Sequence, residues 1–326
     1  MQFGAPRRVE LVPVEVAEPK PGQVLVRTEV SGISGGTELL AYRGEVDPDL
    51  PLDDTLGSLG GTFRFPFRYG YSAVGIVEVS RADGIAEGAR VFAFHPHQEA
   101  LVVDAADVVV LPGEDPRIAT MLPLVETALQ VTLDAGPRFG EPVVVTGLGA
   151  VEILCGALLA RAGARVIGSD PLAWRRDAAK TFGIDAVEPT ELPSVVDEAS
   201  SGRGVPLVVE ASSRPEVLND ALPLLAAEGT ALVASWYGTK PVRLALGAEF
   251  HRRRLVIRST QVSSIPVSQQ ASWDRHTRLR RARELLSELP LAVLATHEFP
   301  FDRAADAYAA LDRGDEGLIH AALRYR

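Results

Sequence analysis

The sequence predicts an α/β protein in which a β-rich segment precedes a doubly wound parallel sheet. Up to about residue 115, short runs rich in β-branched residues alternate with Gly and Pro turn signals, at 23–30, 73–79, 90–94 and 100–103. From about Met121, helical and extended patterns alternate, which is the order of a parallel sheet with helical crossovers. The predicted helices are 121–135, 150–162, 172–182 and 215–226, and the predicted strands are 143–146, 165–169, 184–187, 206–210, 229–235 and 254–260.

The end of the chain is expected to return to the β-rich domain. Helices over about 273–288 and 302–312 and a short strand, AALRYR, follow the alternating region. The predicted domains are therefore 1–120, completed by 270–326, and 121–269.

Composition and charge narrow the class of protein. The chain has 326 residues, of which 46% are hydrophobic and 23% are charged, as is ordinary for a soluble globular protein. No apolar run reaches the roughly 18 residues of a membrane span, and the N-terminal residues lack the apolar core of a signal peptide. The single cysteine, Cys155, excludes an internal disulfide and a thiolate cluster for structural zinc. Because the net charge is −10, a nucleic-acid partner is disfavoured, and we expect a cytoplasmic protein with neither a nucleic-acid nor a membrane partner.

The segment 143–170, VVVTGLGAVEILCGALLARAGARVIGSD, carries the most specific functional signal. A buried strand, Val143–Val145, is followed by Gly147 and Gly149, which allow a tight turn, and then by an apolar helical run. Backbone N–H groups in such a turn, together with the helix N-terminus, favour a bound diphosphate. Asp170 lies 21 residues after Gly149, where a carboxylate can accept hydrogen bonds from an adenosine ribose. The segment therefore predicts a Rossmann dinucleotide site.

One position departs from the G-x-G-x-x-G pattern. Glu152 stands where a small third residue normally lets the helix pack closely on the strand. Its carboxylate would repel a diphosphate in a partly dry site, and its Cβ is expected to crowd strand 143–146. Three interpretations stay open: the side chain swings to solvent, cofactor affinity is weak, or the scaffold no longer binds a cofactor.

Landmarks along nearly the whole chain resemble the medium-chain dehydrogenase/reductase superfamily. They are KPGQVLVRTEVSGIS, YGYSAVGIVE, EGARVFAF, GLGAVE and VVEASSRPEVLNDALPLLAAEGTALVASWYG. The phrases FPFRYGYSAVG, FAFHPHQ, VETAL, SWYG and FHRRRLVIRSTQV are similar to a zinc-less branch that includes bacteriochlorophyllide-type hydroxyethyl dehydrogenases. The resemblance implies a GroES-like β domain before a Rossmann domain, and a homodimer formed through strand 254–260. It does not imply a chlorophyllide substrate.

The resemblance also locates the positions at which zinc-containing members bind their catalytic metal. Those positions hold Ser34 in SGISGGTE, Tyr71 in GYSAVG and Glu126 in LVETAL, and the four-cysteine lobe for structural zinc is missing. Serine is a poor zinc ligand and tyrosine is rare, so we do not expect zinc catalysis. A remaining possibility is the trio His95, His97 and Glu99, whose alternation would point all three to one side of an extended segment.

Without zinc, an alcohol or carbonyl oxygen still needs a partner that moves a proton and stabilises charge. The candidate catalytic groups are Ser34, Thr37, Tyr71, His95, His97 and Glu126. Tyr71 either points at the substrate or fills the space that zinc would occupy, and Glu126 is either an acid with a raised pKa or an ion-pair partner of Arg64 or Arg68. We expect Glu38 on the surface.

The candidate cofactor residues favour NAD(H), with NADP(H) still possible. Asp170 would repel a 2′-phosphate, whereas Arg175 and Arg176 could pair with one. Gly147, Gly149, Ala150 and Val151 are expected at the diphosphate, and by resemblance Ser212, Ser235 and Gln261 line the ribose and nicotinamide.

Three functions are compatible with these features. The first is a zinc-independent, nicotinamide-dependent alcohol dehydrogenase or carbonyl reductase for a small polar metabolite. The second is a metal-free enoyl or quinone reductase using NADPH, and the third is a non-redox enzyme or binding protein on the same fold. The stretch Glu45–Phe67 is expected to cap the substrate cleft and to set specificity.

Overall fold

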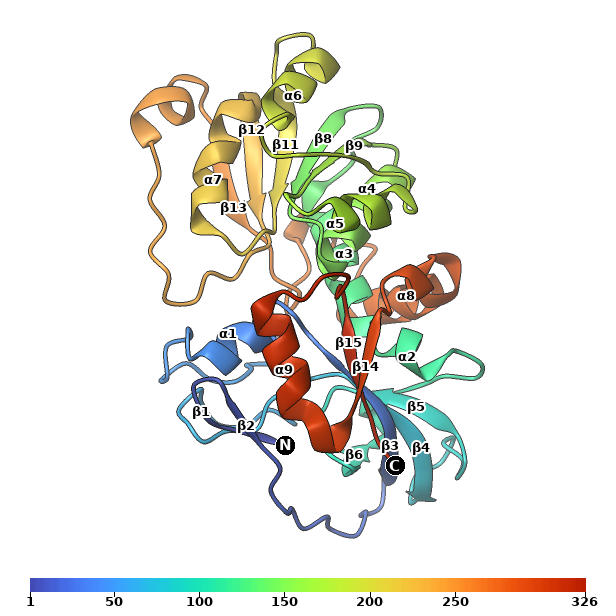
Figure 1. The fold of residues 1–326 in the computed structure, drawn as a ribbon. Helices are drawn as coiled ribbons and strands as arrows, with labels where there is room; N and C mark the ends of the chain where they lie inside the picture. The colour runs from blue at the N-terminus through green and yellow to red at the C-terminus, as the bar shows by residue number, and fades with distance from the viewer. The chain divides into compact units, whose positions relative to one another are not determined.

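The computed structural model describes residues 1–326, which form two compact units (Figure 1). The first unit contains Met1–Pro123 and Ala295–Arg326, and the second contains Leu124–Leu294. None of the helices is both long and apolar enough to cross a lipid bilayer.

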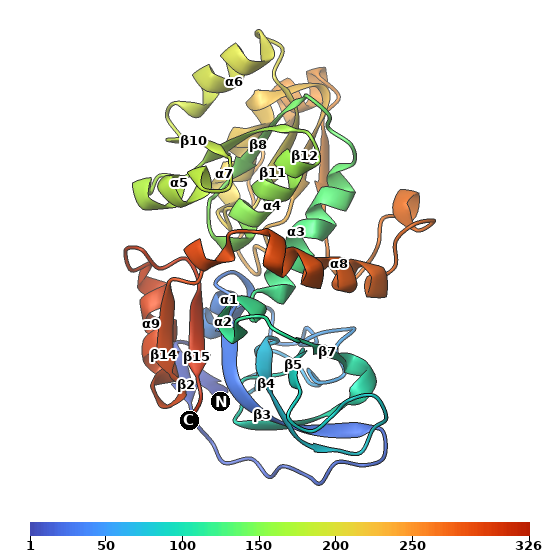
Figure 2. The same cartoon turned by 90° about the vertical axis from the view of Figure 1, so that its right-hand side faces the viewer.

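The first unit is built on one curved sheet of seven strands. Its strands are β3 (Gln23–Ile33), β4 (Ala73–Ser80), β5 (Arg90–Ala93), β6 (Ala100–Asp104), β7 (Val108–Val110), β14 (His297–Pro300) and β15 (Ala321–Arg324). The order is β14-β15-β3-β4-β5-β7 (Figure 2). The strand β6 pairs with the first half of β3. Only β14 and β15 are parallel to each other. A separate hairpin of β1 (Gln2–Ala5) and β2 (Arg8–Glu10) and the helices α1 (Thr37–Arg43), α2 (Pro116–Ala119) and α9 (Ala304–Arg313) complete the unit.

The long strand β3 organises this unit because it pairs with three different strands. Val24, Val26 and Val30 alternate along it and are fully or almost fully buried, as the two-residue period of a strand requires. The register between β3 and β4 shifts directly after Thr28, which pairs with Gly75, and a Cβ on Gly75 would lie 2.1 Å from the Arg27 carbonyl oxygen. Only glycine therefore permits this close approach.

A second core lies where α1 and α9 pack beside the sheet. It is rich in aromatic rings, and Phe3 contacts Tyr308 edge to face with ring centroids 5.2 Å apart. Leu52, Leu59 and Phe63 from the Glu45–Phe67 stretch are buried in the same core. This aromatic core surrounds the buried polar groups described below.

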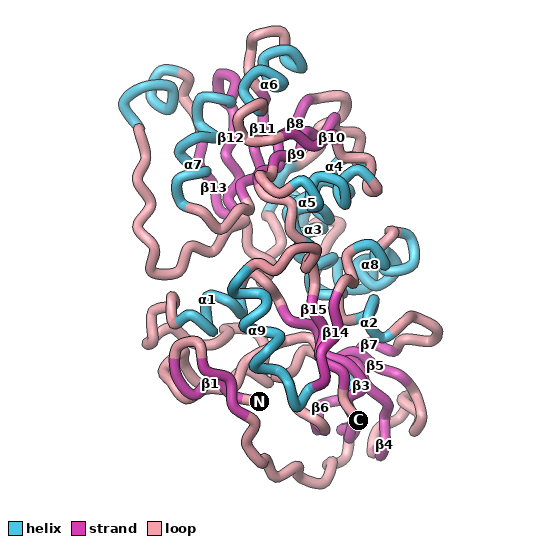
Figure 3. Tube along the Cα trace, in the orientation of Figure 1, coloured by secondary structure: helices cyan, strands magenta, loops and turns pink.

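The second unit is a six-stranded parallel sheet covered by helices on both faces (Figure 3). Its strands are β8 (Pro142–Thr146), β9 (Arg165–Ser169), β10 (Asp185–Val187), β11 (Val205–Glu210), β12 (Leu225–Val233) and β13 (Val256–Ser259). Its helices are α3 (Leu122–Ala135), most of which lies in this unit, α4 (Ala150–Arg161), α5 (Ala173–Lys180), α6 (Leu192–Ser200), α7 (Pro215–Ala221) and α8 (Arg275–Glu288). The strand order β10-β9-β8-β11-β12-β13 is that of a doubly wound dinucleotide-binding sheet, so the predicted fold class is confirmed.

The structure differs from the sequence-based boundary at residues 270–294. These residues, including α8, belong to the second unit, and only Ala295–Arg326 return to the first. The physical reason is the inner face of α8, where Ala282, Leu285 and Leu286 are buried and Arg278 pairs with Glu126 of α3. The helix α6 was not among the predicted elements. It supplies Leu192 and Val196 to the hydrophobic core that also contains Val144.

Candidate active site

The zinc-ligand positions of the first unit hold hydroxyl groups. Ser34 directly follows β3, and Thr37 begins α1 two residues after Gly35. The side chains of Ser34 and Thr37 hydrogen-bond the hydroxyl of Tyr71, which lies just before β4. The structure therefore brings together three of the predicted catalytic residues around one phenol.

The environment of Tyr71 keeps its phenol protonated at neutral pH. Burial raises the pKa of Tyr71 to about 12, and the nearby Glu38 carboxylate acts in the same direction. The hydrogen bonds from Ser34 and Thr37 act in the opposite direction because they stabilise the phenolate, but burial outweighs them. At neutral pH this group can donate a proton, whereas it is a weak base.

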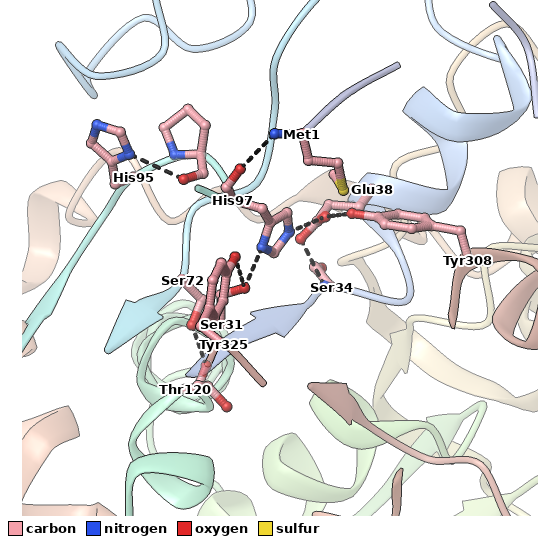
Figure 4. Close-up of polar contacts among 11 residues, drawn as sticks. Met1, Ser31, Ser34, Glu38, Ser72, His95, His97, Thr120, Tyr308 and Tyr325 are labelled. Carbon is pink, nitrogen blue, oxygen red and sulfur yellow. Dashed lines mark hydrogen bonds and ion pairs between the residues drawn. The ribbon is translucent and has the colours of Figure 1, made fainter. Parts of the chain in front are cut away.

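Behind this cluster, Glu38 is completely buried, so the expectation that it lies on the surface was wrong. Its carboxylate accepts hydrogen bonds from the Ser34 backbone N–H, at 2.9 Å, and from the Tyr308 hydroxyl of α9. His97 Nε2 lies 2.9 Å from Glu38 Oε2, the oxygen that also accepts from Tyr308 (Figure 4). A buried carboxylate is tolerated when such donors replace its lost water.

The hydrogen-bond chain continues through His97 to a second tyrosine. His97 Nδ1 lies 2.7 Å from the Ser31 hydroxyl, which lies 2.9 Å from the hydroxyl of Tyr325. With a donor at His97 Nε2 toward Glu38 and an acceptor at Nδ1 toward Ser31, every group of the chain has a hydrogen-bond partner. His97 therefore holds Glu38 in place, and it is fully buried rather than free to meet a ligand.

The predicted alignment of His95, His97 and Glu99 was also wrong. His97 is fully buried, His95 is half-buried and bonds the carbonyl of Pro96, and Glu99 is exposed. The alternation rule does not apply because this segment is not a strand. Burial lowers the pKa of His95, so its imidazole is neutral at neutral pH.

Glu126 belongs to the second unit, and its charge partner was predicted incorrectly. The guanidinium of Arg278, not that of Arg64 or Arg68, donates to Glu126 Oε1 at 3.1 and 2.9 Å, and it also bonds Gln130. Burial raises the pKa of Glu126, and Arg278 opposes that shift. The side chains of both charged partners are almost fully buried, which makes this an internal ion pair.

No group of three or more His, Cys, Asp or Glu side chains is arranged to hold a metal ion. Cys155 is buried in α4, and its burial raises the pKa of the thiol, so it is not available as a thiolate ligand.

The turn between β8 and α4 has the backbone geometry of a dinucleotide site. Gly147 has φ +85°, and a Cβ there would lie 3.0 Å from the Cα of Ser212. The Leu148 N–H donates to Asp170 Oδ2 at 2.9 Å, so the acid at the end of β9 also holds the turn. Gly149 then leads into the first N–H groups of α4, near Ala150 and Val151. The backbone of residues 147–151 therefore fits a diphosphate.

The buried carboxylate of Asp170 already has hydrogen-bond partners within the protein. In addition to Leu148, its carboxylate accepts from the Leu172 N–H at 2.8 Å, and Arg175 lies 3.4 Å away. Arg175, which the sequence suggested as a partner for a 2′-phosphate, is paired with this acid in the structure. The remaining acceptor capacity of the carboxylate is what a ribose hydroxyl would use.

At the ends of the next two strands, a buried acid arranges the predicted serines. Glu210 ends β11 without any exposure and accepts from the backbone N–H of Ser212, at 2.9 Å, and from the hydroxyls of Ser212 and Tyr237. Ser235 accepts from the Ser213 N–H at 2.8 Å, which ties the loops after β11 and β12 together. Gln261 is exposed and bonds within its own turn, through the Ser263 N–H.

Glu152 lies over the turn, with its carboxylate directed back to the start of its own helix. A Cβ on Gly149 would lie 2.6 Å from Glu152 Oε2, and the side chain accepts from its own backbone N–H. A close approach that needs glycine occurs one turn later in α4, where a Cβ on Gly156 would lie 2.6 Å from Ile184. Glu152 is thus accommodated by the packing, and its carboxylate occupies the anion-binding end of α4.

Sequence reasoning missed Glu210, Tyr308 and Arg278. The available signal for Glu210 was an acid directly after an apolar run, VPLVVE, at the carboxyl end of a central strand. Tyr308 and Arg278 lie on helices with mixed polarity, and nothing local distinguishes them from surface residues.

Comparisons with known proteins agree with this architecture. Residues 150–280 match the family model described as zinc-binding dehydrogenase. The chain is 29% identical to the 2-desacetyl-2-hydroxyethyl bacteriochlorophyllide A dehydrogenase of Cereibacter sphaeroides, over 94% of this chain and 92% of that protein. It is 28% identical to the D-guloside 3-dehydrogenase of Escherichia coli K12, over 83% of each. Among solved structures, an alcohol dehydrogenase from Escherichia coli CFT073 in complex with NADH superposes with a TM-score of 0.76, at 20% identity over 99% of this chain and 98% of that chain.

A β domain with a dinucleotide-binding sheet and these relatives define an oxidoreductase of the dehydrogenase class. The chain is similar along most of its length to dehydrogenases of the medium-chain dehydrogenase/reductase superfamily, as its sequence motifs predict.

Proposed function

We propose that this protein transfers hydride, without zinc, between a nicotinamide cofactor and the alcohol or carbonyl group of a small polar metabolite. The observation that carries the proposal is the Tyr71 phenol with its Ser34 and Thr37 partners. By resemblance, Tyr71 and Ser34 stand at positions where zinc members have metal ligands. A protonated phenol can perform the task of the metal at oxygen, because it both donates a hydrogen bond and supplies a proton.

Different residues of the chain would bind the cofactor and donate the proton. The backbone of residues 147–151 would hold the diphosphate, Asp170 the adenosine ribose, and Ser212 and Ser235 the second half of the cofactor. When bound, the cofactor supplies or accepts the hydride at the substrate carbon. In the reduction direction, Tyr71 donates its proton to the carbonyl oxygen, and the hydroxyls of Ser34 and Thr37 stabilise the phenolate that remains until it is reprotonated.

The cofactor preference that we propose is NAD(H). The buried carboxylate of Asp170 would lie next to the 2′ position and would repel a phosphate there. Arg175 lies 3.4 Å from that carboxylate and is already paired with it, which reduces its capacity to attract a 2′-phosphate.

A polar substrate is supported by a hollow within the first unit. Its volume is about 370 Å³, and it is lined by residues of the Glu45–Phe67 stretch and its surroundings, among them Ser58, Thr62, Arg64 and Arg68. These side chains offer hydroxyl and guanidinium donors to oxygen atoms of a ligand. The relative named for a guloside acts on a compound of this polar kind.

We also propose that two copies associate through β13. This strand ends the sheet of the second unit and pairs only with β12, so one row of its backbone groups has no strand partner. Val256 on it is 45% exposed. A second copy of the same edge would extend the sheet across the interface.

One specific observation favours a different class of function. The carboxylate of Glu152 lies where the diphosphate would bind, which is what a scaffold that has lost cofactor use would display. A non-redox binding protein or enzyme is therefore the second candidate.

A titration and a metal analysis test the proposal together. NADH and NADPH are titrated into the purified protein by fluorescence and calorimetry, and the zinc content is measured before and after chelation. We expect tighter binding of NADH than of NADPH, and turnover of polyols or their ketones that survives the chelator. Stoichiometric zinc that is lost together with activity would refute the metal-free mechanism. Absence of binding of both cofactors at millimolar concentration would favour the non-redox candidate.

A further inference from the structure

Glu152 places a side-chain anion in the part of the dinucleotide site that normally receives the ligand's own anion. Its Oε2 lies 2.6 Å from the point that a Cβ on Gly149 would occupy, at the residue that begins α4. The N–H of Glu152, one of the four at the start of a helix that lack an intrahelical acceptor, donates to its own carboxylate. Diphosphate and Glu152 therefore compete for the same donors.

The surroundings of this carboxylate disfavour its negative charge. Two further acids, Asp170 after β9 and Glu210 at the end of β11, face it and raise its pKa. Arg175 of α5 is the cation that opposes this shift, and it is already paired with Asp170. The thiol of Cys155, on the same helix, is also close enough to interact with Glu152. With burial as the largest cause, the pKa of Glu152 rises to about 7, so the group changes charge in the physiological range.

We propose that the dinucleotide site binds its diphosphate together with one proton, and that Glu152 is the residue that receives the proton. The inference rests on the proposed use of a nicotinamide cofactor and deepens it. A neutral carboxyl removes one repulsive charge from the site and turns an acceptor into an O–H donor toward a phosphate oxygen. Without the proton, a third carboxylate faces the diphosphate beside Asp170 and Glu210.

The proposal fixes the pH dependence of cofactor affinity and its sign. The binding-competent form is the protonated one, so affinity is high below the pKa of Glu152 and falls as pH rises through it. With half of the sites protonated at pH 7, the dissociation constant for NADH rises about 50-fold between pH 7 and pH 9. At pH 8, binding takes up about 0.9 proton per NADH, because about nine tenths of the free sites are ionised there.

The experiment uses NADH, whose diphosphate does not titrate in this range, and needs no turnover. Calorimetric titrations at pH 8 in two buffers of different ionisation enthalpy give the number of protons taken up, and titrations from pH 6 to pH 9 give the dissociation constants. The variants are Glu152→Gln, which keeps the shape and removes the charge, and Glu152→Gly, which restores the third glycine. The matched control is Glu198→Gln, on the exposed face of α6.

The expected result is proton uptake and a steep pH dependence in the wild type and in Glu198→Gln, and neither in the two Glu152 variants. Both of those variants should bind NADH at pH 9 at least tenfold more tightly than the wild type. Tight wild-type binding that is independent of pH, with no proton uptake, would overturn the inference alone and would mean that Glu152 moves aside in its charged form. Absence of NADH binding in every variant at every pH would overturn the proposed function and this inference with it. The proton count is measured on the wild type, so the test stands even where a variant fails to fold.

Discussion

Replacing Tyr71 by phenylalanine is the sharpest test of metal-free catalysis. The variant removes one oxygen and keeps the ring, which lies 6.1 Å from the ring of Tyr69. The lost oxygen is the one proposed to donate a proton, and general acid catalysis of this kind contributes about 10²- to 10⁴-fold to a rate. We therefore expect kcat for carbonyl reduction to fall by that factor, which corresponds to about 3–5 kcal/mol of barrier.

The structure separates this catalytic loss from a loss of folding. Ser34 and Thr37 would each lose one hydrogen-bond partner, at a cost of about 1 kcal/mol or somewhat more for each. A domain of this size should tolerate that, and the melting temperature and the NADH dissociation constant of Tyr71→Phe should stay close to those of the wild type. Tyr69→Phe is the matched control, because Tyr69 is a buried neighbour that we assign no part in proton transfer.

The pH dependence adds a second readout with a definite sign. Because the pKa of Tyr71 is about 12, the phenol is protonated throughout the range in which the protein is assayed, and the reduction rate should show no titration of this group. Oxidation needs the phenolate, whose fraction rises about tenfold for each pH unit below that pKa, so the oxidation rate should rise with pH. A Tyr71→Phe enzyme that retains kcat within a few-fold, with the same pH profile, would refute the assignment.

Two further predictions concern the second unit. Arg278→Met removes the counter-charge of the buried Glu126 carboxylate and should lower the free energy of unfolding, measured by urea denaturation, by roughly 3–5 kcal/mol. The double variant with Glu126→Gln should recover part of that lost stability, because no unpaired charge is left buried. A double variant less stable than Arg278→Met would contradict the pairing. For Glu152, the pKa is about 7 in the folded state against an ordinary value of 4.5, so the folded state binds the proton more strongly than the unfolded state. The free energy of unfolding therefore falls as pH rises from 4.5 through 7, by up to about 3 kcal/mol. Glu152→Gln should therefore melt higher than the wild type at pH 8 and at nearly the same temperature at pH 4.5, and a difference that does not change with pH would argue against the raised pKa.

The parts of this protein that depend on local sequence were predictable. The strand, turn, helix and closing acid of residues 143–170 lie within one stretch of chain, and each follows from hydrophobic periodicity and glycine geometry. The family resemblance extended this to the order of domains and to the hydroxyl side chains at the zinc-ligand positions.

The errors concern residues whose partners are distant in sequence. Glu38 meets His97 from 59 residues away and Tyr308 from 270 residues away, and no local pattern contains those pairings. A signal was present in the apolar run from Leu39 to Tyr42, which leaves this short helix little polar surface. In the same way, Glu126 finds Arg278 across 152 residues, so its burial was predictable but its partner was not.

The arrangement of the first unit determines the order in which the chain can finish folding during synthesis. Residues 124–294 leave the ribosome before Ala295–Arg326, so the second unit is complete while β3 still lacks its neighbour β15 and Glu38 still lacks Tyr308. Until then, the nascent first unit exposes a strand edge and an unfinished aromatic core. The growing chain therefore depends on Ala295–Arg326 to close the unit that was begun first, and the unpaired strand edge is open to aggregation until these residues emerge.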